Sequence, residues 1–498
     1  MTLQKLYGQF FTDDIIANFM VKLACFKGAT SFLDPAVGKG IFLRCVEKLY
    51  PNIQKDAFDV DPHMLSICKK NGYKVNLICN DYLTSKVSHL YDVIICNPPY
   101  HKFHEISNKT LLLNRFRNKY NVNLSGYSNL CIYFLIKSIN ELSKNGKCSY
   151  IIPYEFLNTG YGIKVKEYLL KSGKLSQIIR FDNKLNLFKG ALTTSCILLL
   201  ENKSHSYVDF INVTDLSDLN NYNKTTKKRI LYNDLDCKEK WLKYFSDQID
   251  QTFSNLVQLK DICTVKRGIA TGCNGFFTLS TQEILKKNLS KASCVPCLCK
   301  SPDIKSLILD QSVFEEMDRD NKKLYLFDGE KASTISDFNY IKEGEKQGID
   351  KGYLTSHRNP WYAIEQKQIA PIWISVFSRN KIKIIRNELS IKNLTTFHGV
   401  YFHDELKKEE DINIFFCYLL TPVAQKIMYM NKREYGDGLD KFEPNDLNNS
   451  YVLNTQVLKL QDKKIIIDIY NKLKIQESID LISELNSIFS SYVLSSVV

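Results

Sequence analysis

Short apolar runs alternate with segments of helical periodicity over the first 200 residues. Runs with the length and composition of buried strands occur at residues 31–36, 56–61, 76–81, 91–97, 147–153, 175–182 and 196–202. Helical patterns occur at residues 13–26, 40–50, 62–72, 128–146 and 161–173. This alternation predicts an α/β fold with a doubly wound, Rossmann-like parallel sheet covered by helices on both faces.

The pattern changes after residue 202. Residues 203–255 are polar and rich in Asn, Asp and Lys, which predicts a connector with little core of its own. From residue 256 to residue 498 the strand and helix rhythm is lost, and basic and aromatic residues are scattered along the chain. We therefore predict a catalytic domain at 1–202, a connector at 203–255 and a mixed α+β domain at 256–498.

Polar residues follow each of the first four predicted strands. The four sequences are "DPAVGKG", "DVDP", "NDYL" and "NPPY", in chain order. In an open parallel sheet, ligands bind at the carboxyl ends of the strands. The four sequences therefore predict one ligand site at that edge.

The first three sequences suit a nucleoside. Asp34 can hold a cationic amino group, while Gly38 and Gly40 let the backbone approach the ligand. Asp59 can accept from two ribose hydroxyls, and Asp81 can accept from an adenine amino group. Each residue alone could be an ordinary turn or helix cap, so the prediction depends on their succession. The first turn lacks the GxGxxG spacing of a pyrophosphate site, which favours a nucleoside without phosphates.

The sequence "NPPY" at 97–100 predicts a rigid hook at the end of a buried strand. Proline restricts the backbone, so the Asn97 side-chain oxygen and the Pro98 carbonyl are two acceptors held in place. Two convergent acceptors match an amino group with two hydrogens and free its lone pair for attack on an electrophilic methyl group. Tyr100 offers an aromatic face for a base. The hook predicts methyl transfer to an amino group of a base.

These motifs, in this order, resemble those of the gamma-class adenine-N6 DNA methyltransferases of the TaqI-like type. The segments "GQFFTDDIIANFMV", "NGKCSYIIPYEFLNTGYG" and "NKLNLFKGALTTSCILLLEN" are also similar to motifs of that family. The resemblance implies S-adenosyl-L-methionine as cofactor, bound by Thr12, Asp34, Ala36, Gly38, Gly40, Asp59, Asp81 and Asn97. It implies catalysis by Asn97, Pro98, Pro99 and Tyr100 on a flipped adenine. Phe188 matches the aromatic residue that stacks on the adenine face opposite Tyr100. The family often has Glu where this chain has Asp34 and Asp59, so the exact contacts differ.

The C-terminal half resembles, more loosely, the target-recognition domains of the same family. The similar segments include "VKRGIATGCNGFFTLS" and "APIWISVFSRNKIKIIRN", in which Lys266, Arg267 and Arg379 are candidate DNA contacts. Double-stranded DNA is the expected partner, together with a separately encoded restriction endonuclease, and we expect a monomer. The first motif begins near residue 8, which disfavours a fused N-terminal nuclease.

Composition adds little to this picture. The net charge of +13 favours an anionic partner such as nucleic acid, although a Lys-rich proteome produces the same bias. Fifteen scattered cysteines and no signal peptide predict reduced thiols in the cytoplasm. No apolar stretch reaches the ~18–20 residues of a membrane span. Cys294, Cys297 and Cys299 lack a fourth ligand with paired spacing, so we predict a strand there and no metal site.

Two alternatives remain open. The hook accepts any planar amino group, so RNA or a protein glutamine could be the substrate instead of DNA. The chain could also be an inactive DNA-binding subunit, although Asp34, Asn97 and Tyr100 are all present.

Overall fold

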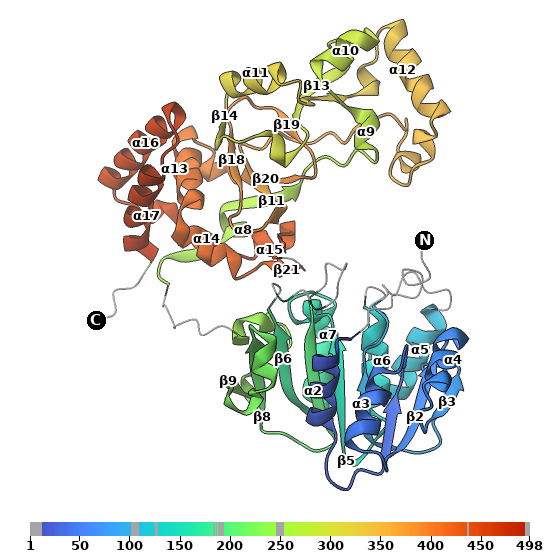
Figure 1. The fold of residues 1–498 in the computed structure, drawn as a ribbon. Helices are drawn as coiled ribbons and strands as arrows, with labels where there is room; N and C mark the ends of the chain where they lie inside the picture. Colours follow the sequence, from blue (N-terminus) through green and yellow to red (C-terminus); the bar gives the residue numbers. More distant parts are fainter. Residues whose placement is uncertain are drawn as a thin grey trace. The chain divides into compact units, whose positions relative to one another are not determined.

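The computed structural model forms two compact units. It describes residues 12–100, 109–124, 128–182, 185, 187, 194–245, 253–435 and 438–493. The first unit is Met1–Gln248 together with Arg433–Gly438, and the second unit is Ile249–Lys432 together with Leu439–Val498 (Figure 1).

A nine-stranded sheet forms the centre of the first unit, in the order β3-β2-β1-β4-β5-β7-β6-β8-β9. Its strands are β1 (Ser31–Asp34), β2 (Gln54–Asp59), β3 (Asn76–Cys79), β4 (Tyr91–Cys96), β5 (Leu142–Ile152), β6 (Leu175–Phe181), β7 (Cys196–Glu201), β8 (Tyr207–Val213) and β9 (Lys227–Leu231). Neighbours from β3 to β5 are parallel, whereas β7 runs antiparallel to β5 and β6. All the predicted strands belong to this sheet, so the doubly wound α/β fold is confirmed.

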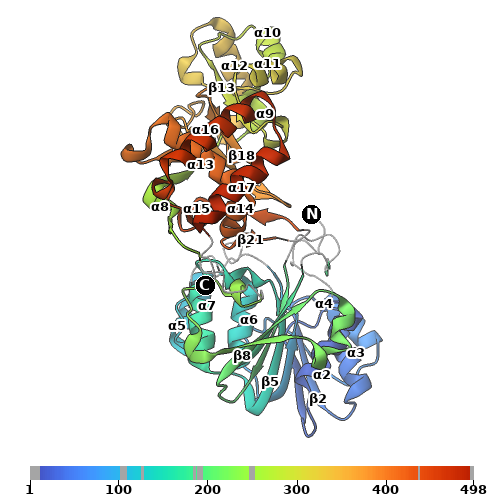
Figure 2. The ribbon, with the colours of Figure 1, turned by 90° about the vertical axis from the view of Figure 1, so that its left-hand side faces the viewer.

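Two layers of helices cover the sheet (Figure 2). The helices are α2 (Asp14–Ala24), α3 (Ile41–Leu49), α4 (Pro62–Lys70), α5 (Lys109–Tyr120), α6 (Leu130–Ile139) and α7 (Gly162–Ser172). Helices α2, α3 and α4 share one apolar core with the sheet, and α5, α6 and α7 share the other. Among the helices that the structure describes, none has the length and apolar character needed to span a membrane.

The segment 128–146 differs from the predicted helix. Helix α6 ends at Ile139, and β5 already begins at Leu142. Asn145 has a φ of 66°, and a Cβ atom on Gly146 would lie 2.8 Å from a backbone oxygen of β4. These two residues therefore allow an irregular stretch of strand to approach β4 closely, and they do not end a helix.

Residues 203–255 also differ from the predicted connector. Strands β8 and β9 extend the sheet beyond β6, and Trp241 is buried in the same core. The polar composition has a physical reason, because β9 is the edge strand and part of its "KKRIL" sequence faces solvent. The first unit therefore continues past residue 202, and its boundary falls at Gln248.

The second unit contains a five-stranded sheet, β11-β20-β16-β18-β14, and a four-stranded sheet, β12-β15-β13-β19. Its strands are β10 (Leu256–Gln258), β11 (Cys263–Arg267), β12 (Thr278–Leu279), β13 (Cys294–Leu298), β14 (Ile308–Leu309), β15 (Tyr325–Phe327), β16 (Ile372–Ser375), β17 (Phe377–Ser378), β18 (Ile384–Asn387), β19 (Lys392–Asn393), β20 (Phe397–Phe402), β22 (Asp440–Lys441) and β23 (Tyr451–Leu453). Its helices are α8 (Leu259–Ile262), α9 (Asn274–Phe277), α10 (Thr281–Lys287), α11 (Gln311–Arg319), α12 (Ile335–Lys346), α13 (Glu409–Leu420), α14 (Pro422–Tyr429), α15 (Pro444–Asn448), α16 (Leu460–Ile475) and α17 (Ile479–Val493). Helices α13, α14, α16 and α17 share a core with the larger sheet, which confirms the mixed α+β class. The predicted strand at "CVPCLC" is β13.

Candidate active site

The carboxyl ends of four adjacent parallel strands bring the predicted site residues to one edge of the sheet. Asp34 and Asp59 are the last residues of β1 and β2, and Asp81 lies two residues after β3. Asn97 directly follows β4, which is the other neighbour of β1. Residues spread over more than 60 positions of the chain are thus collected along one edge.

The turn after β1 is held against the end of β2. The Gly38 amide donates to the Asp59 carboxylate at 2.8 Å, and the other oxygen of that carboxylate accepts from the Asp61 amide at 2.9 Å. A Cβ atom on Gly40 would lie 3.0 Å from the Cys68 sulfur, so helix α4 leaves no room for a side chain there. Among the residues that the structure describes, none comes within 4 Å of a Cβ atom built on Gly38. Open space therefore lies beside the Gly38 backbone.

Asp34 is a fully buried carboxylate at this edge. Its Oδ1 accepts from the Ala36 amide at 3.2 Å, whereas its buried Oδ2 has no hydrogen-bond partner among the described residues. Burial and the nearby Asp59 charge raise the pKa of Asp34 well above its usual value. A donor or cation from a ligand would satisfy Oδ2 and favour the ionised form.

Asp59 and Asp81 are less constrained. Burial raises the pKa of Asp59, and each of its oxygens still has accepting capacity beyond the backbone bond that it makes. Asp81 is half-buried, and its Oδ1 accepts from the Leu83 amide at 2.9 Å, as a turn cap does. The placement of both residues is compatible with ribose and adenine contacts.

Asn97 is connected to the segment that precedes helix α2. Its Nδ2 donates to the Thr12 hydroxyl at 3.0 Å, across 85 residues of sequence. Because the Asn97 amide nitrogen donates to Thr12, Oδ1 is the atom of this side chain that can accept a hydrogen bond from a ligand. Thr12 and Asn97 therefore lie next to each other, a contact that the sequence did not predict.

Tyr100 is anchored at the tip of its side chain. Its hydroxyl donates to the Ile151 carbonyl of β5 at 3.1 Å, and its ring packs against both cores of the first unit. Burial raises the pKa of Tyr100 well above its usual value, so the phenol is neutral. The ring is held in one orientation, as a stacking surface needs to be. Its proposed partner Phe188 lies outside the described residues, so that part of the prediction stays a prediction.

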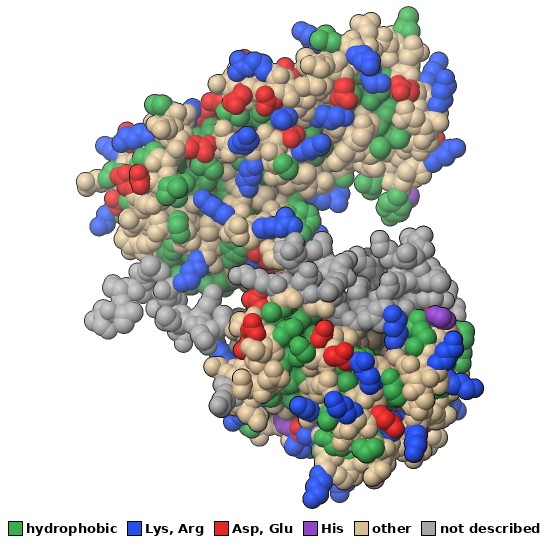
Figure 3. Space-filling model, in the orientation of Figure 1, with side chains coloured by type: hydrophobic (Ala, Val, Ile, Leu, Met, Phe, Trp, Pro, Cys, Tyr) green, Lys and Arg blue, Asp and Glu red, His purple; other side chains and the backbone are tan. Residues whose placement is uncertain are grey.

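The predicted basic residues of the second unit do not share one surface. Lys266 and Arg267 are consecutive in β11 and both exposed, so their side chains leave opposite faces of the strand. Arg379 is exposed just after β17. Figure 3 shows Lys and Arg side chains spread over both units and mixed with acidic ones. Net charge alone therefore does not locate a DNA surface.

Two family models match the chain. "Eco57I restriction-modification methylase" matches residues 43–188, and "Type II methyltransferase M.Eco57I, C-terminal domain" matches residues 238–488. The chain is 38% identical over 485 residues to the type II methyltransferase M.AccI of Acinetobacter calcoaceticus, covering 95% of this chain and 90% of M.AccI. The chain belongs to the type II DNA methyltransferase family.

Two further matches have lower sequence identity. The type II methyltransferase M.XamI of Xanthomonas campestris pv. amaranthicola is 23% identical over 455 residues, covering 87% of this methyltransferase and 82% of M.XamI. The solved structure of the type IIL restriction-modification enzyme MmeI in complex with DNA aligns with a TM-score of 0.60 at 12% identity, covering 99% of this chain and 74% of MmeI. At that identity the likeness shows the fold alone.

This methyltransferase uses S-adenosylmethionine, and the residues at the sheet edge fit it. The buried Oδ2 of Asp34 has no donor among the described residues, and the amino group of the methionine part would provide one. The open space beside Gly38 is bordered by Asp59, whose carboxylate suits ribose hydroxyls. These two carboxylate acceptors therefore match a nucleoside that carries a cationic amino group.

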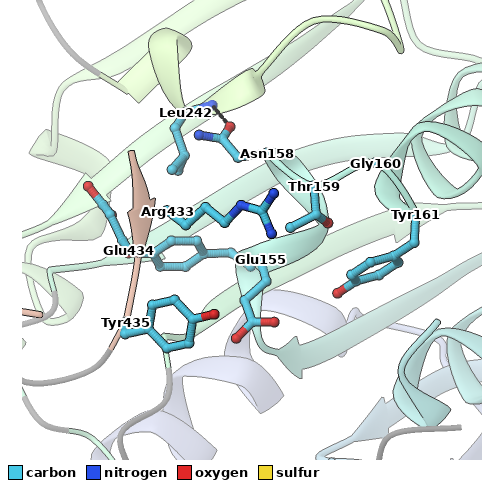
Figure 4. A pocket seen from close by; sticks show the side chains of 10 residues that line it. Glu155, Asn158, Thr159, Gly160, Tyr161, Leu242, Arg433, Glu434 and Tyr435 are labelled. Atoms are coloured by element: carbon cyan, nitrogen blue, oxygen red, sulfur yellow. Dashed lines mark hydrogen bonds between the residues drawn. The ribbon is translucent and has the colours of Figure 1, made fainter. Parts of the chain in front are cut away.

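Sequence reasoning did not find a second feature of the methyltransferase unit, a pocket of about 470 Å³ that follows β5. It lies beside the short helix Tyr154–Leu157 and includes the distant segment Arg433–Tyr435. In Figure 4 the Arg433 side chain extends toward Thr159. No local motif indicates this pocket, because its walls are separated by more than 250 residues.

A buried ion pair holds that distant segment. Glu434 lies 2.6 Å from the Arg180 guanidinium, and the Tyr154 hydroxyl donates to the same carboxylate at 2.6 Å. The exposed fractions of the Arg180 and Glu434 side chains are 16% and 7%. Both charges are thus largely removed from water and depend on each other.

Replacing Glu434 with Gln is expected to destabilise the methyltransferase. Arg180 would then lose its buried ion-pair partner and keep only the electrostatic interaction with Asp182, and breaking a buried pair costs about 3–5 kcal/mol. The expected result is a lower thermal unfolding midpoint, measured by differential scanning calorimetry. Glu405→Gln, at an exposed position, is the matched control and should leave the midpoint unchanged. Equal unfolding midpoints for Glu434→Gln and the wild type would contradict the role of the pair. The double variant Arg180→Met, Glu434→Leu removes both charges, so its unfolding midpoint should lie above that of Glu434→Gln.

Proposed function

We propose that this type II methyltransferase transfers the methyl group of S-adenosylmethionine to the N6 amino group of an adenine turned out of duplex DNA. The observation that carries the proposal is the hook after β4. Asn97 and the Pro98 carbonyl are two acceptors beside Asp34, Gly38 and Asp59, which fit the cofactor. Two acceptors on a stiff backbone match one amino group with two hydrogens.

The residues of the hook orient the amino group. The two N–H groups of the amine donate hydrogen bonds to Asn97 Oδ1 and to the Pro98 carbonyl. These two bonds draw the nitrogen lone pair out of conjugation with the ring. The Thr12 hydroxyl holds the Asn97 amide in the orientation that this requires. When bound, S-adenosylmethionine supplies the electrophilic methyl group that the nitrogen accepts. The surplus proton then leaves to water, so no side chain has to act as a general base.

Base flipping makes the amino group accessible. In the duplex the amino group of adenine is hydrogen-bonded to the paired thymine. Turning the base out of the duplex costs a few kcal/mol. We propose that stacking on Tyr100, whose ring is anchored by its bond to Ile151, offsets part of this cost. Phe188 is the proposed residue on the opposite face of the base.

We propose that the second unit recognises the DNA target. The fold likeness to MmeI, which was solved in complex with DNA, supports this role. Lys266, Arg267 and Arg379 are the proposed contacts. We further propose that the protein acts as a monomer alongside a separately encoded restriction endonuclease.

The direct test is methylation with isotopically labelled S-adenosylmethionine. Purified protein should label duplex DNA, and mass spectrometry of the digested nucleosides should find the label in N6-methyladenosine. Label in N4-methylcytosine would overturn the adenine assignment. Label found only in RNA or in protein glutamine would overturn the DNA assignment. DNA with 2-aminopurine at the target should increase in fluorescence on binding if the base is flipped.

A further inference from the structure

A polar groove of about 580 Å³ lies within the second unit. Arg267 of β11, Phe377 of β17 and His398 of β20 line it, together with Lys441 of β22 and the nearby Glu443. All of these residues belong to the larger sheet or to the short β17 and β22 pair and the turn after it. The groove is therefore formed by one unit alone.

Arg267 interacts electrostatically with the Glu365 carboxylate but forms no direct ion pair with it. Among the described residues, its exposed guanidinium makes no hydrogen bond or ion pair, whereas Lys441 and Glu443 pair at 2.5 Å. Its backbone is well fixed, because Lys367 Nζ donates to the carbonyls of Arg267 and Gly268 at 2.8 and 2.9 Å. A rigid backbone thus presents an uncommitted planar fork of donors.

The surroundings of Arg267 favour a base edge over a phosphate. His398 lies opposite Arg267 in the β11 and β20 register, and its Nε2 lies 2.8 Å from the Phe442 carbonyl. Burial lowers the pKa of His398, so the floor of the groove is neutral and adds no second cation. Phe377 is 51% exposed at the rim and can contact a flat base. Lys441, the second cation of the groove, pairs with Glu443 and lies 5.6 Å from the centre of the Phe377 ring, so Glu443 offsets its charge. A phosphate site would gather several cations without such carboxylate partners, whereas the Arg267 guanidinium near an exposed aromatic ring suits the edge of a base.

Lys266 provides an internal comparison. It pairs with Gly399 in the register, so its side chain leaves the face of β11 opposite to the groove. Its ammonium lies 5.5 Å from the centre of the Tyr401 ring. Two consecutive basic residues of one strand are therefore directed to different surroundings.

We infer that this groove receives the edge of a guanine of the recognition sequence, with Arg267 donating two hydrogen bonds to its O6 and N7 atoms. This inference rests on the proposed function, because it assumes that the second unit binds duplex DNA. It adds that the two neighbouring residues differ in role: Arg267 contacts a base, whereas Lys266 does not face the groove. Arg267 is thereby a specificity-determining residue.

The test first maps the methylated sequence of the wild-type enzyme by sequencing modified bases. Arg267→Gln should then lower the discrimination against a replaced guanine at one position by about 5- to 150-fold in kcat/KM, and leave the other positions as selective as before. Arg267→Lys keeps the charge but loses the fork, so it should lose the same discrimination. Lys266→Gln should change activity on all sequences by one common factor.

Chemical replacement of the base provides a second measurement. DNA with 7-deazaguanine at that position lacks the N7 acceptor, so it should be a poorer substrate for the wild type and an equal substrate for Arg267→Gln. A uniform loss of activity on all sequences in Arg267→Gln, with a salt dependence smaller by one charge, would show a phosphate contact and overturn the inference. A recognition sequence without guanine would overturn it as well. Failure of the proposed function is distinct, because the wild type would then methylate no DNA.

Discussion

Asn97→Ala is expected to lower the rate of methyl transfer on the order of 10²- to 10³-fold, by analogy with the loss of one positioned hydrogen-bonding group in other active sites. In the proposed function Asn97 contributes one of the two acceptors of the hook, and alanine would leave the amino group held by the Pro98 carbonyl alone. Single-turnover kinetics with labelled cofactor measure this step. Affinity for S-adenosylmethionine, measured by calorimetry, should stay within a few-fold of the wild type.

Thr12→Val is the matched control for the hook. It removes the hydroxyl that accepts from Asn97 Nδ2 but keeps both acceptors for the substrate. We expect a smaller loss of rate than in Asn97→Ala, because Asn97 becomes less well oriented but is still present. Wild-type turnover in Asn97→Ala would remove the hook from the mechanism, whatever the behaviour of the Thr12 variant.

Asp34→Asn is expected to stabilise the cofactor-free protein while weakening cofactor binding at least tenfold. Oδ2 of Asp34 is buried and has no hydrogen-bond partner in the described part of the chain, so an ionised carboxylate there costs about 1–3 kcal/mol relative to a neutral side chain. Binding of a cationic amino group reverses that preference, because only the carboxylate attracts it. Thermal unfolding without cofactor and calorimetric titration with S-adenosylmethionine measure the two effects.

The pH dependence of the Asp34→Asn effect has a defined sign. Burial raises the pKa of Asp34 in the folded state, so its contribution to stability is fully present below the unfolded-state value near 4 and is lost as the pH rises. The gain in stability from Asn should therefore vanish below about pH 4 and increase toward neutral pH.

Asp92→Asn is the matched control, with the opposite sign. Asp92 lies in the neighbouring strand β4, and its carboxylate accepts from Ser143, Thr30 and Ser31 at 2.5 to 3.3 Å. Burial raises the pKa of Asp92, but these hydrogen bonds outweigh that effect and lower it. Asn at this position should destabilise the protein at neutral pH.

A lower unfolding midpoint in Asp34→Asn, with cofactor affinity retained, would contradict the role assigned to Asp34.

The strands and helices of the first 200 residues could be predicted because each is determined by local patterns. Buried parallel strands are short apolar runs, and the polar residues that follow them mark the ligand edge whatever the rest of the chain does. The order Asp34, Asp59, Asp81 and Asn97 along the sequence therefore already placed these residues at one edge of the sheet.

The segment 203–245 could not be predicted from local patterns. An edge strand such as β9 has one side in water and reads as a polar loop, and only its pairing with β8 shows that it belongs to the sheet. The irregular part of β5 was missed for a related reason, because Asn145 and Gly146 resemble a helix end when their approach to β4 is unknown.

The sequence by itself determined the fold class and the strand ends at which the proposed site lies, because strand ends and prolines act over a few residues. The tertiary structure alone decided that Thr12 holds Asn97, that Glu434 pairs with Arg180, and that Arg267 and Lys266 have different surroundings. These contacts join residues far apart in the chain or depend on the face of a strand that a side chain leaves. Their energies come from burial and charge pairing, which exist only once the chain is folded.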